Sequence, residues 1–532
     1  MRKKCVCSIG LIVTLVSFFG LSACSGNALS YKYEQELNII DDQYRNYYEV
    51  FVYSFYDSDG DGIGDLKGVI QKLDYIKEMG FNGIWLMPIM PSATYHKYDV
   101  IDYYGIDSEY GTMEDFERLV SECHNRDIRL VIDFVINHSS SQHLWFVEAC
   151  EYLRGLPKEE EAKVSDCPYV NYYHFTKEKP DETYYQVNGT DWYYEGSFWS
   201  EMPDLNWEKE DLKKEFEEIA AFWIDKGVDG FRMDAVMHLS ETDKQLNIDT
   251  INWLYTYCKS LNPDFYMVSE VWANKATIAD YYASKTPSMF NFDVADMEGK
   301  LIKAARGTYK AENFVTSMLT YQTEFTAKNE EYIDAPFLTN HDMGRVSNAL
   351  RGDENDLKMA GGLLLMMNGS PFVYYGEEIG MASSGTKDEN KRLPMIWSAT
   401  KQEGMTVGPK DADTGITSSF AGVEEQMKDE SSILNYYKRA LRLRNENPEI
   451  ARGEIALVEE LCDGHQAVIT KTYENSTIAI VYNTSDEEIE VNLTGSTIEK
   501  MEIRGYLTLK NEEITLKKKK LSMLGQSICI LK

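Results

Sequence analysis

The sequence has little positive charge, no clustered cysteines and, beyond its first 24 residues, no apolar run long enough to span a membrane. Its 532 residues include 54 Lys and Arg against 87 Asp and Glu, a formal net charge of −33. Such a surface repels phosphate backbones and anionic polysaccharides, whereas a neutral polymer feels no net force. Nucleic-acid binding is therefore not expected, and nothing in the sequence indicates a protein partner. Global disorder is also excluded, because 43% of the residues are hydrophobic.

The first 24 residues have the form of an export signal. A basic start, Arg2 to Lys4, precedes an apolar run at 9–21, which is shorter than the roughly 20 residues that cross a bilayer. The segment ends in Leu21-Ser22-Ala23-Cys24, which resembles the lipobox of bacterial lipoproteins. The resemblance implies cleavage before Cys24, a lipid on its sulfur, and an extracytoplasmic protein held to the cell envelope, with residues 25–45 as a polar tether. A plain secretory signal with an incidental cysteine is the alternative.

Six cysteines remain after Cys24, and they show neither a CxxC pair nor zinc-like spacing. We expect them to be small buried apolar side chains. A disulfide between Cys150 and Cys167 is the alternative.

Patterns of buried strands alternate with helical patterns over much of the chain. Runs of β-branched and aromatic residues lie at 50–55, 83–87, 129–135, 231–236, 265–271, 289–294, 336–339 and 371–375. Most are continuous rather than alternating, as in parallel strands that are buried on both faces. Helical spacing lies between several of them, for example from Leu66 to a closing Gly80, and after a capping box at Thr112 and Asp115. The sequence therefore predicts an α/β fold, a (β/α)₈ TIM barrel.

Two segments depart from the barrel pattern. Residues 139–207, after the third expected strand, are rich in Tyr, Asp and Glu and lack sustained periodicity, so we expect an inserted domain B. Residues 454–532 alternate apolar and polar positions between short turns, which predicts a C-terminal antiparallel β-sandwich, domain C. The barrel, domain A, then comprises residues 46–138 and 208–453.

Polar clusters end four of the expected strands. They contain Asp133, Asn137 and His138; Arg232, Asp234 and His238; Glu270; and His341 and Asp342. Reactive groups of a (β/α)₈ barrel project from the C-terminal ends of its strands, so we expect Asp234, Glu270 and Asp342 to meet. Converging carboxylates without a redox or thiol motif favour glycosidic-bond chemistry, which needs a nucleophile or base and a general acid.

In this order and on these strands, the clusters resemble the conserved regions of the α-amylase family, glycoside hydrolase family 13. The resemblance covers about residues 45–532. It implies a retaining mechanism with Asp234 as nucleophile, Glu270 as acid/base and Asp342 as the carboxylate that stabilises the distorted sugar. Arg232 would keep Asp234 ionised. Glu270 must begin protonated, so we expect less polar surroundings such as Trp272 to raise its pKa.

The resemblance also implies substrate contacts around the cleaved bond. His138 and His341 would bond sugar hydroxyls, and His238 and Arg392 fall in further family motifs. Tyr95 to Asp99 resembles the family's Tyr-His-Gly-Tyr stretch, in which the histidine bonds a hydroxyl and the second tyrosine stacks under the sugar. These roles would fall to His96 and Tyr98, with ordinary packing of Tyr98 as the alternative. Lys97 stands in the place of Gly, which predicts a different local backbone.

An acidic loop follows the first expected strand. Oxygen ligands at alternate positions, from Asp57, Asp59, Asp61, Ile63 and Asp65, match the start of a Ca²⁺ loop. The closing Glu of an EF-hand is replaced by Gly68, so Asp65 is expected to close the shell; a solvated acidic turn is the alternative. A second calcium site of the family would use Asn137 and the carbonyl of His238, but the sequence does not identify its ligand from the insertion.

Two motifs indicate the linkage that is cleaved. Ala235 after the expected nucleophile, with His238, resembles α-1,4-acting members, whereas α-1,6-glucosidases tend to have Val at that position. Met202 to Asn206, with the sequence MPDLN, resembles the fifth region of an intermediate group of amylases. We therefore expect a lipid-anchored α-amylase that acts on starch and maltooligosaccharides.

Other activities use the same three carboxylates and stay open: α-glucosidase, maltogenic amylase, neopullulanase and 4-α-glucanotransferase. A catalytically inactive glycan-binding lipoprotein is an alternative of a different class, which the presence of all three carboxylates disfavours. A solute-binding lipoprotein of a sugar importer is another, but its two-lobed architecture does not fit eight strand-and-helix units.

Overall fold

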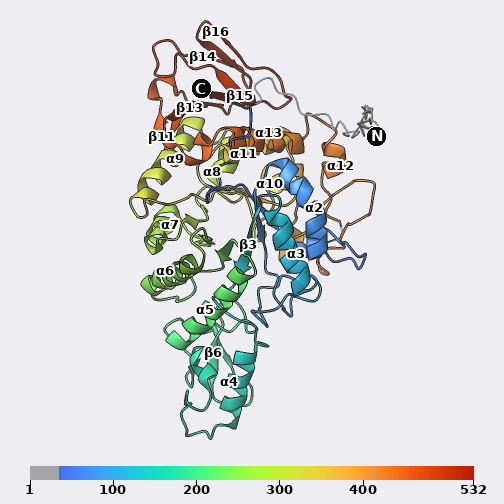
Figure 1. Ribbon diagram of the computed structural model, residues 1–532, viewed down its shortest axis with the longest axis vertical. Helices are drawn as coiled ribbons and strands as arrows, with labels where there is room; N and C mark the ends of the chain where they lie inside the picture. Colours follow the sequence, from blue (N-terminus) through green and yellow to red (C-terminus); the bar gives the residue numbers. More distant parts are fainter. Residues whose placement is uncertain (1–34, 414) are drawn as a thin grey trace, which may run out of the picture.

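The computed structural model describes residues 35–413 and 415–532, so the signal peptide and Cys24 lie outside the described residues. The barrel occupies the middle of the molecule, with the inserted domain at one end and the C-terminal β-domain at the other (Figure 1). Among the described residues, no helix is both long and apolar enough to cross a bilayer.

A curled parallel sheet forms the barrel. Its strands, in the order β10-β1-β2-β3-β7-β8-β9, are β1 (Tyr47–Val50), β2 (Gly83–Leu86), β3 (Arg129–Phe134), β7 (Gly230–Met233), β8 (Tyr266–Ser269), β9 (Ser288–Met289) and β10 (Phe372–Tyr374). Between β9 and β10, parallel bridges of Phe290 to Ala335 and of Phe337 to Phe372 connect the two edges through the segment around 335–337. The predicted TIM-barrel fold is therefore confirmed.

Two of the expected strands differ in the structure. The run at 50–55 is not a strand: β1 lies before it, and residues 52–55 form the short helix α1 (Val52–Phe55). A short, continuously apolar run cannot distinguish a buried strand from a buried helical turn. The run at 336–339 contributes a bridge at Phe337 instead of a regular strand.

Helices follow the strands and cover the outside of the sheet (Figure 1). The larger ones are α2 (Leu66–Met79), α3 (Met113–His124), α5 (Glu210–Asp225), α6 (Lys244–Leu261), α9 (Ala311–Thr326), α11 (Glu354–Leu365) and α13 (Ile433–Glu446). The predicted end of α2 and the predicted start of α3 are confirmed. Gly80 closes α2 with a left-handed φ of 106°, which glycine adopts without steric cost. Thr112 and Asp115 form both hydrogen bonds of a capping box at the start of α3.

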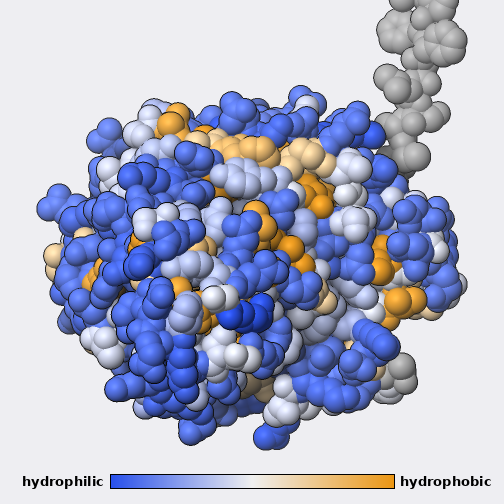
Figure 2. Space-filling model, turned by 90° about the horizontal axis from the view of Figure 1, so that it is seen from below, coloured by the Kyte–Doolittle hydropathy of each residue, from blue (hydrophilic) through white to orange (hydrophobic). Residues whose placement is uncertain are grey.

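The insertion after β3 contains α4 (Leu144–Gly155) and a small antiparallel sheet of β4 (Phe175–Thr176), β6 (Tyr193–Glu195) and β5 (Tyr184–Gln186). A bridge between His138 and Asp204 joins its last residues to the end of the barrel strand. Seen from this end, the molecule is mostly hydrophilic, with small separate hydrophobic areas (Figure 2). Because of the bridge between His138 and Asp204, the insertion borders the end of the barrel at which the strand-end clusters lie.

Domain C consists of two antiparallel sheets around its own apolar core. The first contains β11 (Glu454–Leu457), β12 (Gln466–Tyr473), β13 (Ser476–Asn483), β18 (Ser527–Leu531) and β15 (Ile503–Leu507). The second contains β14 (Ile489–Asn492), β17 (Lys520–Met523) and β16 (Thr515–Lys517). The alternating pattern predicted this architecture.

The structure corrects the expectation of a tether at residues 35–45 and decides whether Cys150 and Cys167 form a disulfide. Residues 35–45 were expected in the tether, but they lie on the barrel: the amide of Asn38 donates to the carbonyl of Asn445 at 2.8 Å, and Asp42 pairs with Arg452 at 2.7 Å. The segment is therefore attached to the barrel, although several of its residues remain exposed to solvent. Cys150 and Cys167 are both free, so the alternative of a disulfide is not realised.

Candidate active site

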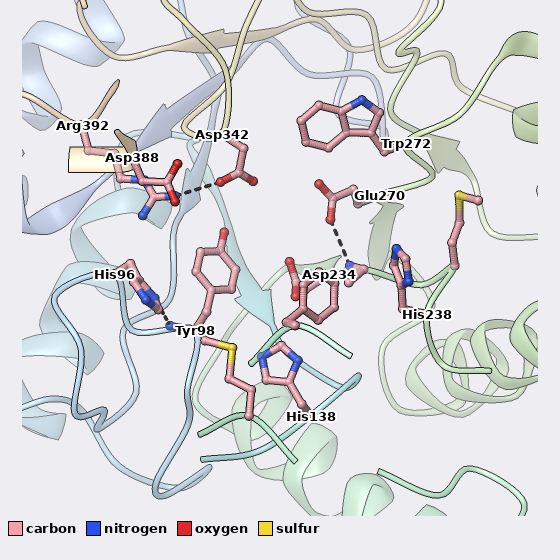
Figure 3. Close-up of a pocket in the computed structure, with 14 residues that line it drawn as sticks. His96, Tyr98, His138, Asp234, His238, Glu270, Trp272, Asp342, Asp388 and Arg392 are labelled. Atoms are coloured by element: carbon pink, nitrogen blue, oxygen red, sulfur yellow. Dashed lines mark hydrogen bonds and ion pairs between the residues drawn. The ribbon is translucent and has the colours of Figure 1, made fainter. Parts of the chain in front are cut away.

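A cavity of about 320 Å³ opens at the C-terminal ends of the barrel strands. Its lining contains every predicted catalytic or substrate-binding residue except Arg232 and His341, which lie directly behind it. The lining residues are His96, Tyr98, His138, Phe198, Met202, Asp234, Ala235, Met237, His238, Glu270, Trp272, Asp342, Asp388 and Arg392. In Figure 3, Asp234, Glu270 and Asp342 face the same space, with His96 and Arg392 on one side and His238 and Trp272 on the other.

The strand ends bring the two expected catalytic partners together. Asp234 directly follows β7 and Glu270 directly follows β8, its neighbour in the sheet. Ala235 then takes a left-handed φ of 47°, and its amide donates to Glu270 Oε2 at 3.0 Å. An alanine in this conformation carries backbone strain of the kind that collects at functional sites. The strained turn thus fixes the Glu270 carboxyl against the backbone of the loop that carries Asp234.

Arg232 supplies one positive charge to three carboxylates. It is 0% exposed; Nη1 lies 2.8 Å from Asp133 Oδ1 and 2.5 Å from Asp234 Oδ1, and Nη2 lies 3.1 Å from Glu270 Oε2. Burial raises the pKa of Asp133 to about 7 although Arg232 opposes the rise. The expected pairing of Arg232 with the nucleophile is present. Sequence reasoning gave Asp133 no role, although it stands in the cluster that ends the third strand.

Glu270 has a raised pKa, as an acid that begins protonated requires. Burial is the main cause; Arg232 lowers the pKa, and the neighbouring charges of Asp234 and Asp342 raise it further. Trp272 lines the same cavity beside Glu270, is 50% exposed and stacks on Phe292, with ring centroids 5.0 Å apart (Figure 3). The cause is therefore burial among like charges.

Asp342 is the third carboxyl side chain of the cavity and lies on the side opposite Asp234 and Glu270. Arg392 Nη2 donates to its Oδ1 at 2.8 Å, and His341 Nε2 lies 3.0 Å from its Oδ2. Burial alone would raise the pKa of Asp342, but His341 and the two arginines outweigh it and hold the pKa well below its usual value. Asp342 is therefore held ionised, whereas the pKa of Glu270 is shifted in the opposite direction.

Tyr98 lies beside Asp133 and His341. Its hydroxyl donates to Asp133 Oδ2 at 3.0 Å and lies 2.7 Å from His341 Nε2, and its ring is nearly parallel to that of His341. His96 Nδ1 accepts from the amide of Tyr98 at 3.1 Å, and burial, with the charge of Arg392, lowers its pKa to about 4. His96 is therefore neutral and fixed on the loop that carries Tyr98.

Lys97, between these two residues, keeps the turn that a glycine would favour. It adopts a φ of 66°, so the expected difference in backbone does not follow from the replacement of Gly. Its buried ammonium lies 3.0 Å from Asp107 and also pairs with Glu109. These ion pairs offset the steric cost of a left-handed lysine.

Domain B contributes an aromatic side chain to the cavity that the sequence did not predict. The side chain of Phe198 is 51% exposed, and its ring centroid lies 5.6 Å from that of His138 and 5.1 Å from that of His238. Asp388, from the segment after β10, is a further missed residue of the cavity. Phe198 stands four residues before the MPDLN segment, which is the signal that could have indicated it.

The acidic loop after β1 gathers part of the expected calcium ligands. Carboxylate oxygens of Asp57, Asp59 and Asp61 lie within 4.8 Å of one another. Asp65 is not in this group: its carboxylate accepts from the amide of Gly68 at 2.8 Å, as the N-cap of α2, and from Ser58. Three hard oxygen donors at this spacing fit a Ca²⁺ ion. The expectation for Asp65 as the closing ligand is not supported by its orientation.

Near the insertion, the structure brings Asp204 to the expected second calcium site. Asn137 Nδ2 lies 3.4 Å from Asp204 Oδ1, and the buried Oδ1 of Asn137 has no hydrogen-bond partner among the described residues. Asp204 belongs to the MPDLN segment. It is a carboxylate of the insertion that lies beside Asn137, and spacing could not indicate it because 67 residues separate the two.

Comparisons with known proteins agree with this site. Residues 49–453 match the family model described as the catalytic domain of alpha amylase. Alpha-amylase 3 of Dictyoglomus thermophilum is 38% identical over 483 residues, which cover 88% of this chain and 91% of the relative. Glucan 1,6-alpha-glucosidase of Streptococcus pneumoniae is 30% identical over 513 residues, which cover 84% and 92%. The solved structure of Eubacterium rectale Amy13B is 41% identical, with a TM-score of 0.91 and coverage of 94% of this chain and 99% of that one. The chain therefore belongs to the α-amylase family, glycoside hydrolase family 13.

Proposed function

We propose that this glycoside hydrolase is an α-amylase that cleaves α-1,4-glucosidic bonds of starch and maltooligosaccharides with retention of configuration. The observation that carries the proposal is the arrangement of Asp234 and Glu270 on one guanidinium, with ionised Asp342 across the same cavity. Retaining enzymes need a carboxylate nucleophile and a protonated acid close together, about 5–5.5 Å apart. Two carboxyl groups that share Arg232 satisfy this requirement for proximity.

The reaction then follows from the charge of each group. Asp234, beside Arg232, attacks the anomeric carbon while Glu270 gives its proton to the leaving glycosidic oxygen. Glu270, now ionised, removes a proton from water, which attacks the glycosyl-enzyme ester and releases Asp234. Asp342 is ionised throughout, and it stabilises the positive charge that develops on the sugar ring.

The cavity suits a neutral glucan. Phe198 and Trp272 each expose about half of their side chain at the cavity, where an aromatic face can cover a sugar ring. Ala235 and His238 support α-1,4 specificity, and the MPDLN segment supports assignment to the intermediate group of amylases. A relative named Alpha-amylase 3 is 38% identical, against 30% for one named Glucan 1,6-alpha-glucosidase, which makes α-1,6 cleavage the second candidate.

Product analysis on starch, pullulan and maltotriose tests this function. An α-amylase releases mixed maltooligosaccharides from starch, whereas an α-glucosidase releases glucose alone and a glucanotransferase forms products longer than its substrate. Asp234→Asn serves as the inactive control. Failure of the wild-type enzyme to shorten any of the three substrates would refute the proposal.

We also propose that Asp57, Asp59 and Asp61 hold a Ca²⁺ ion that stabilises the loop. Gly60 and Gly62, with φ of 88° and 97°, allow the tight turn that directs these carboxylates to one point. The ion would offset the repulsion among the carboxylates and take no part in bond cleavage. Calcium titration of metal-free protein by calorimetry, with Asp59→Asn as the impaired variant, tests the site; no binding heat beyond that of the variant would contradict it.

The remaining proposal concerns the N-terminus, which lies outside the described residues. Leu21 to Cys24 supports lipidation of Cys24 and an extracytoplasmic enzyme attached to the cell envelope. Expression in a bacterial host with radiolabelled palmitate tests it. Label in the wild-type protein but not in Cys24→Ser is expected, and equal labelling of both would contradict the proposal.

A further inference from the structure

A buried carboxylate stands behind the active-site cavity without lining it. Glu49, on β1, is 1% exposed, and its Oε1 lies 2.6 Å from Nδ1 of His341. Strand β1 lies between β10 and β2, so the carboxylate belongs to the rigid middle of the sheet. Glu49 therefore reaches the catalytic group through His341.

His341 connects Glu49 to the reacting centre through its second nitrogen. Its ring is completely buried, and Nε2 lies 3.0 Å from Asp342 Oδ2 and 2.7 Å from the hydroxyl of Tyr98. That hydroxyl donates its own proton to Asp133, so towards His341 it acts as an acceptor. When Glu49 and Asp342 are both ionised, both ring nitrogens face acceptors, an arrangement that only the doubly protonated imidazolium satisfies.

The charges around the ring also favour the imidazolium. Asp342 and Glu49 contact it directly, and Asp133 acts from β3 at longer range. Burial raises the pKa of Glu49 itself, but His341 and, from β7, Arg232 lower it and so favour the charged form of Glu49. Burial lowers the pKa of His341, but Asp342 and Glu49 outweigh burial and raise the pKa to about 9.

Glu49 has a further buried carboxyl near it. Glu377, from the turn after β10, has a raised pKa that is caused mainly by burial and further by the charges of Glu378 and Glu49. A protonated Glu377 leaves the negative charge of Glu49 directed to His341. The two buried acids therefore do not compete for the imidazolium.

We propose that Glu49 is a positioning residue of the hydrolase: it fixes the His341 ring and keeps it protonated, so that one imidazolium holds Asp342 ionised and correctly oriented towards the sugar. The proposal rests on the proposed function of Asp342 as the third catalytic carboxylate. It assigns a role to a residue on β1, a strand whose end carries none of the catalytic carboxylates.

Three variants separate positioning from simple structural support. Glu49→Gln removes the charge with little change in shape, and Glu49→Asp keeps the charge. Glu378→Gln is the matched control, because Glu378 is an equally buried carboxyl of the barrel that accepts from the hydroxyls of Tyr48 and Tyr75 at 2.6 Å and does not contact His341. Circular dichroism and thermal melting of each variant establish that it is folded.

The deciding measurement is the titration of His341 by NMR in ¹⁵N-histidine-labelled full-length enzyme, with the signal assigned from its loss in His341→Asn. We expect a pKa near 9 in wild type and in Glu378→Gln, and a pKa lower by at least one in Glu49→Gln. Glu49→Asp is expected to recover most of the difference. Equal titration of His341 in wild type and Glu49→Gln would overturn the proposal, even if the enzyme proves to be an α-amylase.

Kinetics give a second readout. With a chromogenic maltotrioside, kcat/KM of Glu49→Gln relative to wild type is expected to fall at least about twofold more at pH 8 than at pH 6, since a His341 pKa that is lower by one leaves about half of the imidazole neutral at pH 8. The ionisation of Glu270 affects both enzymes equally, so it cancels in the ratio of their kcat/KM values. A ratio that is independent of pH would indicate structural support only and contradict the proposal. Inactivity of the wild-type enzyme, in contrast, would refute the proposed function and leave the NMR result interpretable.

Discussion

Replacement of Arg232 by Met removes the one positive charge that three active-site carboxylates share. Arg232 contacts Asp133, Asp234 and Glu270 at 2.5–3.1 Å and is inaccessible to solvent. Loss of one partner from a buried ion pair costs about 3–5 kcal/mol, because the remaining charge is left without compensation. At about 1.4 kcal/mol per factor of ten, the same energy in the transition state lowers kcat/KM by a factor of about 10² to 10⁴.

The proton equilibria predict a signature that simple destabilisation would not give. Arg232 lowers the pKa values of Asp133 and Glu270, so its removal raises both, and the alkaline limb of the kcat/KM profile, where Glu270 loses its proton, moves to higher pH. Arg232→Lys is the control: it keeps the charge, but a single ammonium cannot reproduce the forked contacts, so we expect an intermediate loss.

Steady-state kinetics on a chromogenic maltotrioside between pH 4 and pH 9, together with urea denaturation, provide the test. The reasoning is refuted if Arg232→Met keeps its activity within tenfold of wild type and its alkaline limb at the wild-type pH. A variant that loses stability but retains the profile would show that Arg232 supports the fold without tuning the carboxylates.

Four further predictions follow from the same contacts. Asp234→Asn should abolish turnover and leave binding of maltoheptaose intact by calorimetry; undiminished hydrolysis would remove the nucleophile assignment. Saturation with calcium at a hundredfold of its Kd should stabilise metal-free protein by about 2.7 kcal/mol, seen as a rise in Tm that EDTA reverses and Asp59→Asn lacks; identical melting with and without calcium would contradict it. Lys97→Gly relieves about 1–2 kcal/mol of left-handed strain but leaves the buried Asp107 unpaired at a cost of about 3–5 kcal/mol, so a net loss of stability is expected in urea, and a more stable variant would show that strain dominates. The pKa of His341 is raised from 6.5 to about 9, so its contribution to the free energy of unfolding is fully present below pH 6.5 and is lost as the pH rises through 9. Urea titrations should show this loss in wild type and a smaller one in Glu49→Gln, whereas parallel curves would argue against a protonated His341.

Local patterns were sufficient where a physical preference acts over a few residues. The capping box at Thr112 and the glycine after α2 predicted helix limits, because each satisfies the unpaired backbone groups of a helix end. Periodicity was ambiguous at 50–55, where the apolar run proved to be a buried helical turn after β1. The segment at 35–45 has the polarity of a tether, and only its ion pairs with barrel residues show that it lies on the surface of the barrel.

The sequence by itself determined the fold class, the identity of the expected catalytic carboxylates and the acidic loop, because strand periodicity and residue type depend only on residues that are close together in the chain. Only the tertiary structure decided what surrounds those groups. Asp133 beneath Arg232, Glu49 behind His341, Phe198 at the cavity and Asp204 beside Asn137 are contacts between strands and loops far apart in the chain. A pKa depends on burial and on charges a few ångströms away, so the raised pKa of Glu270 and the lowered pKa of Asp342 could be assigned physical causes only after the barrel had brought their neighbours together.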